Sequence, residues 1–508
     1  MTRIAPFFLV IWNMIKLIDV SQMKLAERDY MKSTGIESAE LIEAAAKAFC
    51  GIFCGLVPEK SKAILILCGT GNNGSDGLAI ARLLQYSGYS DIEVAIVSTS
   101  RPGTDDFGLH LRRLGKTPVK VKYITEADHF IFTQPVVIDA LLGSGINRPL
   151  EAELRTIVRN VNESPARIIA VDCPTGFRCE GRLDHNEVVM KASDVISFQR
   201  PKLNFFFPES SSALARFHVV DIGLQENFIE SLPSYYHLIE PRDVGRVLKA
   251  RPEFSHKGAY GHVLIYAGSK GKAGAALLAA EACVYSGAGL TSVAMPEADR
   301  LALHTRLPEA MFVDLDDHAG FEEKQYSVIA FGPGLGDKPR FIEAILASST
   351  VPLVVDADGL NYLSVHQELL AKLPPRSILT PHMKEFDRLF GPSDNWFDRV
   401  QLARSEAGKR QLYIVLKNRY TFIILPDGRV LINPSGNPGM ASGGMGDALT
   451  GIIASFIAQG YGEEDACMIA CFIHGRAGDV VRSRGNAVVP ASLLISSLPQ
   501  ILGELQWP

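Results

Sequence analysis

The chain is poor in cysteine and carries little excess charge of either sign. Only 8 of its 508 residues are cysteine, and no two of them are spaced as a CxxC pair. Zinc sites and the disulfide frameworks of small secreted domains need denser, paired cysteines, so we expect buried thiols in a reducing, cytoplasmic setting. A formal net charge of −5 gives no general attraction to nucleic acid or to an acidic membrane surface.

Long hydrophobic runs are also missing. The apolar segment 6–12 follows Arg3, but it is short and no small-residue cleavage site follows it, so an extended start is favoured over a signal peptide. Met1 and Met14 both remain possible as the true start. Elsewhere no run approaches the roughly 18 apolar residues that a membrane-spanning helix needs. We therefore expect neither a membrane nor a nucleic-acid partner.

A chain of 508 residues is long enough for more than one hydrophobic core. In both halves, short β-branched runs alternate with amphipathic segments, which predicts mainly parallel sheets with helices on both faces. The pattern weakens around Pro241 and Pro252, so we predict domains at 1–228 and 256–508 joined by a linker at 229–255. The predicted strands are 63–68, 92–97, 135–139, 167–172, 195–198 and 218–221 in the first half, and 261–268, 291–295, 327–331, 352–356, 414–416, 421–425 and 430–432 in the second.

A glycine-rich segment at 69–77 joins the first of these strands to a helix predicted at 77–87. It is not the dinucleotide-binding GxGxxG pattern. Its asparagine and aspartate side chains add oxygen ligands to the backbone N–H groups, so the loop is suited to a phosphate and a cation. Asp139 and Asp172 end two later strands, and ligands bind beyond such ends in parallel sheets. For each aspartate alone, a capping or turn role is the alternative.

A second glycine-rich segment, 437–451, contains Asp447 and leads into an apolar helix predicted at 448–459. Glycines let the backbone approach an anion closely, and a helix start offers free N–H groups and positive dipole charge. An aspartate there can take a proton from an attacking hydroxyl group. The alternative is a glycine-lined turn with Asp447 as the N-cap.

Together with segments 139–149, 171–176, 201–203 and 221–224, the first loop resembles the Rossmann-like epimerase domain of the NAD(P)H-hydrate repair enzymes, from about residue 14 to 228. The resemblance implies interconversion of the R and S forms of NAD(P)H hydrated at C6 of the nicotinamide ring. It implies proton transfer by Asp172 and a K⁺ ion held by Asn73, Asp139 and Thr175. Ser75 stands where the family usually has glycine. The implied hydrate-binding residues are Asn72, Asn73, Gly74, Ser75, Asp76, Gly143, Ser144, Gly145, Ile146, Asn147, Arg148, Pro149 and Asp172.

Residues 256–503 resemble the ADP/ATP-dependent NAD(P)H-hydrate dehydratase domain, which is ribokinase-like, through segments such as 256–261, 331–336, 356–361 and 474–479. The resemblance implies phosphorylation of the hydrate's hydroxyl group by ADP or ATP with Mg²⁺, followed by loss of phosphate. Asp447 then activates the hydroxyl group, and the N–H groups of 443–446 hold the transferred phosphoryl group. The implied hydrate-binding residues are Ala275, Gly334, Gly336, His382 and Asp447, and the nucleotide-binding residues are Lys417, Asn418, Arg419, Tyr420, Thr421 and Gly446. For His382 alone, a capping or core role is the alternative.

The sequence thus predicts two three-layer α/β domains, Rossmann-like and then ribokinase-like, in a bifunctional enzyme that repairs NADHX and NADPHX, the hydrates of NADH and NADPH. We expect a cytoplasmic homo-oligomer. The alternative function is a ribokinase-like small-molecule kinase carrying an N-terminal binding module. The oxygen ligands Asn73, Asp139 and Asp172 favour the enzyme over the module, because a pure interaction module does not need them at strand ends.

Overall fold

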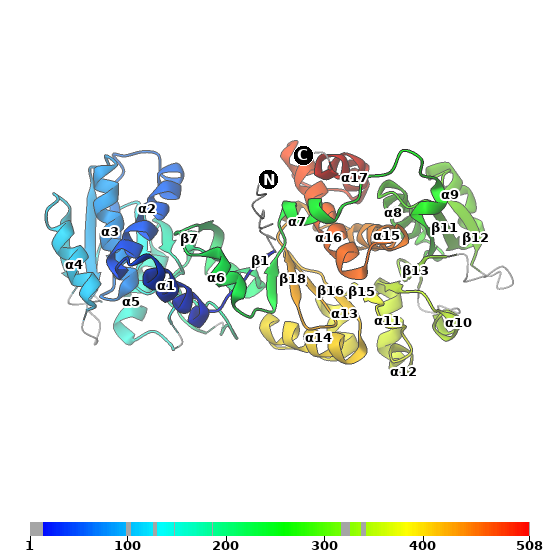
Figure 1. Cartoon of the computed structure of the whole chain (residues 1–508), viewed down its shortest axis with the longest axis horizontal. Helices are drawn as coiled ribbons and strands as arrows, with labels where there is room; N and C mark the ends of the chain where they lie inside the picture. Colours follow the sequence, from blue (N-terminus) through cyan, green and yellow to red (C-terminus); the bar gives the residue numbers. More distant parts are fainter. Residues whose placement is uncertain are drawn as a thin grey trace, which may run out of the picture. The chain divides into compact units, whose positions relative to one another are not determined.

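The computed structural model describes residues 14–97, 103–124, 127, 130–146, 148–184, 186–315, 326–336 and 342–506. The chain divides into two compact units (Figure 1). The N-terminal body consists mainly of Lys16–Ser234, and the C-terminal body of Tyr235–Asp394 and Asp398–Pro508. Each has a mostly parallel sheet between helical layers, which confirms the predicted fold class. No helix of the described ranges is both long enough and apolar enough to cross a membrane.

The sheet of the N-terminal body has seven strands within the described ranges, in the order β4-β3-β2-β5-β6-β7-β8. All neighbouring pairs are parallel. The strands are β2 Ile64–Cys68, β3 Ile92–Val97, β4 Lys120–Ile124, β5 Val136–Ala140, β6 Arg167–Val171, β7 Ala192–Phe198 and β8 Leu214–Val220. Strand β4 was not predicted, because it lies at the sheet edge, where it is largely exposed and carries lysines.

Alternating residues of the central strand β2 pack into two separate hydrophobic cores. Ile64 and Ile66 pack in one core with apolar residues of α2 and α3, whereas Leu65 and Leu67 pack in the other with residues of α5. This is the expected period of two for a strand buried on both faces. The helices are α1 Val20–Thr34, α2 Ser38–Leu56, α3 Asn72–Tyr86, α4 Asp105–Leu114, α5 Ala152–Glu163 and α6 Glu226–Ser231.

The sheet of the C-terminal body runs β1-β9-β18-β17-β16-β15-β14-β13-β10-β11-β12. Strands β10 to β16 pair in parallel, and β17 forms antiparallel pairs with β16 and β18, so the predicted hairpin is confirmed. The strands are β1 Ile15–Lys16, β9 Tyr236–Leu238, β10 His262–Tyr266, β11 Leu290–Met295, β12 Met311–Asp314, β13 Val328–Phe331, β14 Leu353–Val355, β15 Ile378–Leu379, β16 Tyr413–Leu416, β17 Thr421–Ile424 and β18 Val430–Asn433.

Two helical layers cover this second sheet. Val263 and Ile265 of β10 pack into the core that α8, α15, α16 and α17 share, and Leu264 and Tyr266 pack into the core of α10, α11 and α12 (Figure 1). The helices are α7 Pro241–Val247, α8 Ala273–Tyr285, α9 Arg300–Arg306, α10 Ile342–Ser348, α11 Ala357–Val365, α12 Gln367–Leu370, α13 Met383–Phe390, α14 Trp396–Arg410, α15 Met445–Ala458, α16 Glu463–Ser483 and α17 Ala491–Gln506.

The segment 229–255, predicted as a linker, contains regular structure that belongs largely to the C-terminal body. It holds β9 and α7, and β9 pairs in parallel with β18. That body therefore begins near Tyr235 rather than at 256. The reason the pattern was weak is that β9 has only three residues, all half-buried, whose position is set by pairing with a distant strand.

Candidate functional sites

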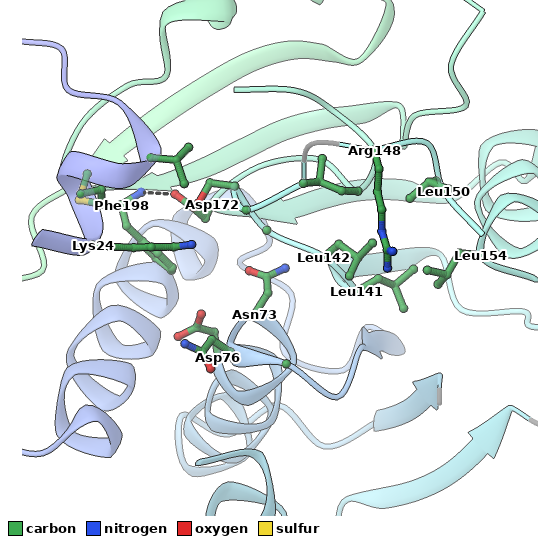
Figure 2. A pocket seen from close by; sticks show the side chains of 18 of the residues that line it. Lys24, Asn73, Asp76, Leu141, Leu142, Arg148, Leu150, Leu154, Asp172 and Phe198 are labelled. Atoms are coloured by element: carbon green, nitrogen blue, oxygen red, sulfur yellow. Dashed lines mark hydrogen bonds between the residues drawn. The ribbon is translucent and has the colours of Figure 1, made fainter. Parts of the chain in front are cut away.

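The N-terminal body contains a cavity of about 410 Å³ beyond the carboxyl ends of β2, β5 and β6, the usual ligand position in such sheets. Figure 2 shows two different ends of this cavity. Lys24, Asn73, Asp76 and Asp172 gather at one end, and Leu141, Leu142, Leu150 and Leu154 lie with Arg148 at the other. A ligand that fits must therefore present both a polar group and an apolar surface.

The first glycine-rich loop lies against this cavity, and α3 begins inside it. The helix starts at Asn72, five residues before its predicted start at 77, so Asn72, Asn73 and Asp76 belong to its first turns. A Cβ atom added to Gly74 would lie 1.8 Å from the backbone oxygen of Gly69. Close approach of backbone to backbone, rather than to a ligand, therefore requires glycine at position 74.

Most of the predicted hydrate-binding residues line the cavity, with three exceptions. Gly74 and Ser75 are buried behind it, and the Ser75 hydroxyl donates to the Gly71 backbone oxygen at 3.2 Å, so this serine does not crowd the cavity. Asn147 lies outside the described residues. The cavity-lining members of the predicted set are Asn72, Asn73, Asp76, Gly143, Ser144, Gly145, Ile146, Arg148, Pro149 and Asp172.

Asp172 is held in an unusual backbone conformation at the end of β6. Its φ of 61° lies in the left-handed region, where strained residues of functional sites concentrate. Its carboxylate Oδ1 lies 2.8 Å from Lys202 Nζ and accepts a hydrogen bond from the Phe198 backbone N–H at 3.1 Å. Burial alone would raise the pKa of Asp172, but the charge of Lys202 and these hydrogen bonds lower the pKa below its usual range. Asp172 is thus ionised at neutral pH.

Asp139, Thr175 and Asn73 supply the predicted cation ligands. The Thr175 hydroxyl donates to Asp139 Oδ1 at 2.7 Å, and the Thr175 N–H donates to Oδ2 at 2.8 Å. Burial raises the pKa of Asp139 to about 6 despite these hydrogen bonds. Among the residues that the structure describes, the buried Asn73 Nδ2 atom has no hydrogen-bond partner, and Asn73 Oδ1 would lie 3.1 Å from a Cβ atom on Gly143.

Four further residues at this site had no predicted role: Lys202, Lys24, Glu27 and Phe198. Lys202 is 6% exposed, and it neutralises Asp172. A lysine in the apolar segment 201–207 was the available signal, because lysine is rarely buried unless paired. Lys24, Glu27 and Phe198 line the cavity, but α1 carries no motif that would have distinguished the first two from ordinary surface charges.

In the C-terminal body, the second glycine-rich loop brings Asp447 to the start of α15. Gly444 precedes the helix with a φ of 89°, a conformation suited to glycine, and a Cβ there would lie 2.5 Å from Leu278 Cδ1. Helix α15 begins at Met445, three residues before its predicted start at 448, so Asp447 lies in the first turn. Burial, with the nearby charge of Asp356, raises the pKa of Asp447 to about 6.

The buried Asp356 and the half-buried Lys417 form an ion pair beside this helix start. Lys417 Nζ lies 2.7 Å from Asp356 Oδ1, and the Thr450 hydroxyl donates to Asp356 Oδ2 at 2.9 Å. A Cβ atom on Gly446 would lie 3.1 Å from Lys417 Nζ, so the glycine loop runs directly over the pair. The sequence analysis gave Asp356 no role, although it follows a predicted strand.

A cavity of about 600 Å³ adjoins the same loop. Of the predicted nucleotide-binding residues, Tyr420 does not line it, and the Arg419 guanidinium lies 4.6 Å from the Tyr420 ring centre. The cavity also contains His474, which was not assigned a role; burial lowers the pKa of its imidazole to about 4. The predicted residues that line this cavity are His382, Lys417, Asn418, Arg419, Thr421 and Gly446.

The predicted hydrate-binding residues of this body divide into two places. A Cβ on Gly334 would lie 2.9 Å from Ala275 Cβ, and Gly336 donates its N–H to Asp358 at 2.8 Å. Ala275, Gly334 and Gly336 do not line the 600 Å³ cavity, whereas His382 does. His382 is also the N-cap of α13, because its Nδ1 accepts from the N–H groups of Lys384 and Glu385 at 3.1 and 3.3 Å. The local contacts of His382 are therefore those of a helix-capping residue, which was the predicted alternative.

The fold and both sites define a two-domain α/β enzyme that handles nucleotides. Comparison with known proteins gives the same result in more detail. Residues 38–204 match the family described as YjeF-related protein N-terminus, and residues 263–500 match NAD(P)H-hydrate dehydratase. The chain is 32% identical to the bifunctional NAD(P)H-hydrate repair enzyme Nnr of Thermofilum pendens, with 97% of each chain covered.

Further relatives agree. The bifunctional NAD(P)H-hydrate repair enzyme Nnr of Moorella thermoacetica is also 32% identical, with 95% of each chain covered. A ribokinase-like superfamily protein from Enterococcus faecalis has a solved structure that matches with a TM-score of 0.50 and 30% identity, over 55% of this chain and 99% of that chain. The present chain belongs to the family of bifunctional NAD(P)H-hydrate repair enzymes.

Proposed function

We propose that the N-terminal body epimerises R- and S-NAD(P)H hydrates and that the C-terminal body dehydrates the S form, consuming ADP or ATP. The observation that carries this proposal is the position of Asp447 on the first turn of α15, beside the Lys417–Asp356 pair. The glycine loop there leads into a helix start that Gly444 leaves without a side-chain cap. Family membership favours this function over the alternative of a small-molecule kinase with a binding module.

In the dehydratase site, Asp447 takes the proton of the C6 hydroxyl group as the hydroxyl oxygen bonds to the terminal phosphorus of the nucleotide. The bond from that phosphorus to the bridging oxygen breaks, and AMP leaves from ADP or ADP leaves from ATP. The N–H groups of 443–446 stabilise the charge that develops on the transferred phosphoryl group. Breaking the C6–O bond of the phosphate ester, with loss of a proton from C5, restores the C5–C6 double bond. Lys417, Asn418, Arg419, Thr421 and Gly446 hold the nucleotide; Tyr420 would act only through its contact with Arg419.

Magnesium fits this site. One or two carboxylates together with phosphate oxygens are its usual ligands, and the raised pKa of Asp447 reports a buried negative charge without full compensation. Asp356, together with the nucleotide phosphates, would hold the ion, which would supply charge neutralisation at the phosphates and leave Asp447 able to accept the proton.

Potassium fits the epimerase site on similar grounds. Asp139 is fully buried with a raised pKa, and Thr175 and Asn73 add neutral oxygen donors beside it. These three residues would hold the ion, which supplies positive charge next to the bound hydrate. Asp172, kept ionised by Lys202, exchanges a proton at the reacting ring.

We further propose that the protein acts as a homo-oligomer in the cytoplasm, on the hydrates of both NADH and NADPH, without a nucleic-acid or membrane partner. Light scattering on the purified chain tests the oligomeric state. A monomer at micromolar concentration would contradict it.

The decisive experiment follows recovery of dihydronicotinamide absorbance from an R/S mixture of NADH hydrate, with ADP or ATP, Mg²⁺ and K⁺. We expect full recovery with the unmodified protein and no recovery with Asp447→Ala. Asp172→Ala should slow recovery of the R fraction but not of the S fraction, after the spontaneous rate of epimerisation is subtracted. Recovery of only the S fraction by the unmodified protein would remove the epimerase assignment. A phosphorylated product that accumulates would support the kinase alternative.

A further inference from the structure

The polar end of the N-terminal cavity holds more carboxyl groups than one proton transfer needs. Glu27, Asp76 and Asp172 all line it, together with Lys24. Figure 2 shows Asp76 and Asp172 entering the cavity from different elements, α3 and the end of β6, with Asn73 between them in the view. Two carboxyl groups from separate elements can thus contact one bound ring from different directions.

The surroundings of these two carboxyl groups are opposite in character. Asp172 lies 2.8 Å from Lys202 Nζ and accepts the Phe198 N–H. Within the part of the chain that the structure describes, no hydrogen-bond donor or cation contacts the Asp76 carboxyl group. Burial and the negative charges of Asp172, Glu27 and Asp106 raise the pKa of Asp76 well above its usual range, whereas the pKa of Asp172 is lowered.

Two carboxyl groups in one cavity whose surroundings push their pKa values apart are suited to the roles of acid and base. Epimerisation by loss and return of the hydroxyl group uses such a pair, because the group leaves from one face of the ring and returns on the other. Asp172 begins the turnover ionised and so has no proton for the departing oxygen, which a second carboxyl group from another element can supply.

We propose that Asp76 is a second catalytic residue of the epimerase, the acid that protonates the departing C6 hydroxyl group while Asp172 acts as the base. This inference rests on the epimerase function proposed above. The C6–O bond breaks, water leaves, and the ring-nitrogen lone pair forms a C6=N1 iminium. Water then adds to the opposite face, the electron pair returns to nitrogen, and Asp172 takes the released proton. Exchange of protons with solvent restores the starting state, and the reverse direction uses the two residues in exchanged roles.

Glu27 is the competing candidate for the acid. Burial and the charge of Asp172 raise the pKa of its carboxyl group too, although Lys202, Lys24 and Arg28 act in the opposite direction. Glu27→Gln is therefore the matched control, since it removes a carboxyl group from the same end of the same cavity. Loss of the Glu27 charge also lowers the pKa of Asp76, so this variant should move the alkaline limb of the pH profile to lower pH without removing it.

The test measures epimerisation by the full chain through chromatographic separation of the R and S hydrates. No nucleotide is added, so the dehydratase site is inactive. We expect a bell-shaped dependence of kcat on pH for the unmodified protein. Asp76→Asn should lower kcat by about a hundredfold or more with KM little changed, and it should remove the alkaline limb. In ¹⁸O-labelled water, each S product formed from R should gain one labelled oxygen.

Three results would overturn the assignment: a kcat of Asp76→Asn within about threefold of the unmodified value, an unchanged alkaline limb in that variant, or retention of the original oxygen in the product. The isotope result and the bell-shaped pH profile expected of the unmodified protein do not depend on the variant, so they stand even if it does not fold. If the unmodified protein does not epimerise the hydrate at all, the proposed function fails instead.

Discussion

Lys417 Nζ lies 2.7 Å from Asp356 Oδ1 in the C-terminal body, and the N-terminal body repeats this arrangement with Lys202 Nζ 2.8 Å from Asp172 Oδ1. In both cases the aspartate immediately follows a parallel strand, and both partners of the Lys202–Asp172 pair are buried. Burying two charges is costly, and removing one partner leaves the other uncompensated. Each pair therefore keeps an aspartate ionised in or beside its cavity and makes stability depend on the lysine.

Lys202→Met should destabilise the N-terminal body by about 3 kcal/mol and abolish epimerisation, because Asp172 is left buried without its cation. Urea unfolding followed by circular dichroism measures the loss. The control is Lys202→Met combined with Asp172→Asn, which removes the charge, tolerates the left-handed backbone and keeps an acceptor for the Phe198 N–H; it should recover stability but not activity. Since the folded pKa of Asp172 is below its ordinary value of 3.8, the pair stabilises at neutral pH and this contribution disappears as pH falls through that range. Equal stability of single and double variants would contradict the argument.

Dehydratase activity should fall on the acid side of about pH 6, because Asp447 must be ionised to accept the hydroxyl proton and burial raises its pKa to about 6. The measurement is kcat/KM against pH, which reports the free enzyme. Lys417→Gln should move this acid limb to higher pH, since the lysine charge lowers the pKa of Asp447. An acid limb near the ordinary carboxyl range, or one that does not respond to Lys417, would rule out Asp447 as the titrating base.

Much of the fold could be predicted because its strands are continuous apolar runs bounded by turn residues. Residues 64–68 and 136–140 are buried on both faces, so their composition identifies them without tertiary information. Strands β1, β4, β9, β12 and β15 were missed for physical reasons. β4 and β12 lie at sheet edges and are partly exposed, while β1, β9 and β15 have only two or three residues and depend on pairing with neighbours distant in sequence.

The candidate sites were predictable where glycine and aspartate mark loops, and less so where a side chain acts through its environment. The glycine-rich loops identified Asp76 and Asp447, but both helices begin earlier than expected because the loops themselves form the first turns. Lys202 has only its apolar sequence surroundings as a local signal and His474 has none, since the roles of both come from burial beside residues far away in the chain. His382 was grouped with Ala275 by motif, yet the fold places it in the cavity that also contains Lys417.

Gly74→Ala should destabilise the N-terminal body by about 3 kcal/mol. The new Cβ would lie 1.8 Å from the Gly69 backbone oxygen, and neither the helix start at 74 nor the backbone at 69 can move freely. Gly71→Ala is the matched control, since nothing lies within 4 Å of a Cβ at that position and its φ of −93° suits alanine. Thermal unfolding compares the two. Similar melting temperatures for Gly74→Ala and Gly71→Ala would show that the loop accommodates the new Cβ and that stability does not require glycine at position 74.

Potassium should raise the melting temperature of the N-terminal body by on the order of 5 °C at saturation, because a ligand that binds only the folded state stabilises it by mass action. Asp139→Asn should eliminate this response, since it removes the charged ligand of the proposed site while keeping an oxygen that can accept the hydrogen bond of the Thr175 N–H. Sodium and choline chloride at equal ionic strength serve as controls for general salt effects. Asp194→Asn is the matched variant: it removes a buried carboxylate of the same body that pairs with Arg167 instead of the predicted cation ligands, so its potassium response should persist even if its baseline stability falls. An equal rise with all three salts, or a persistent rise in Asp139→Asn, would remove Asp139 from the cation site.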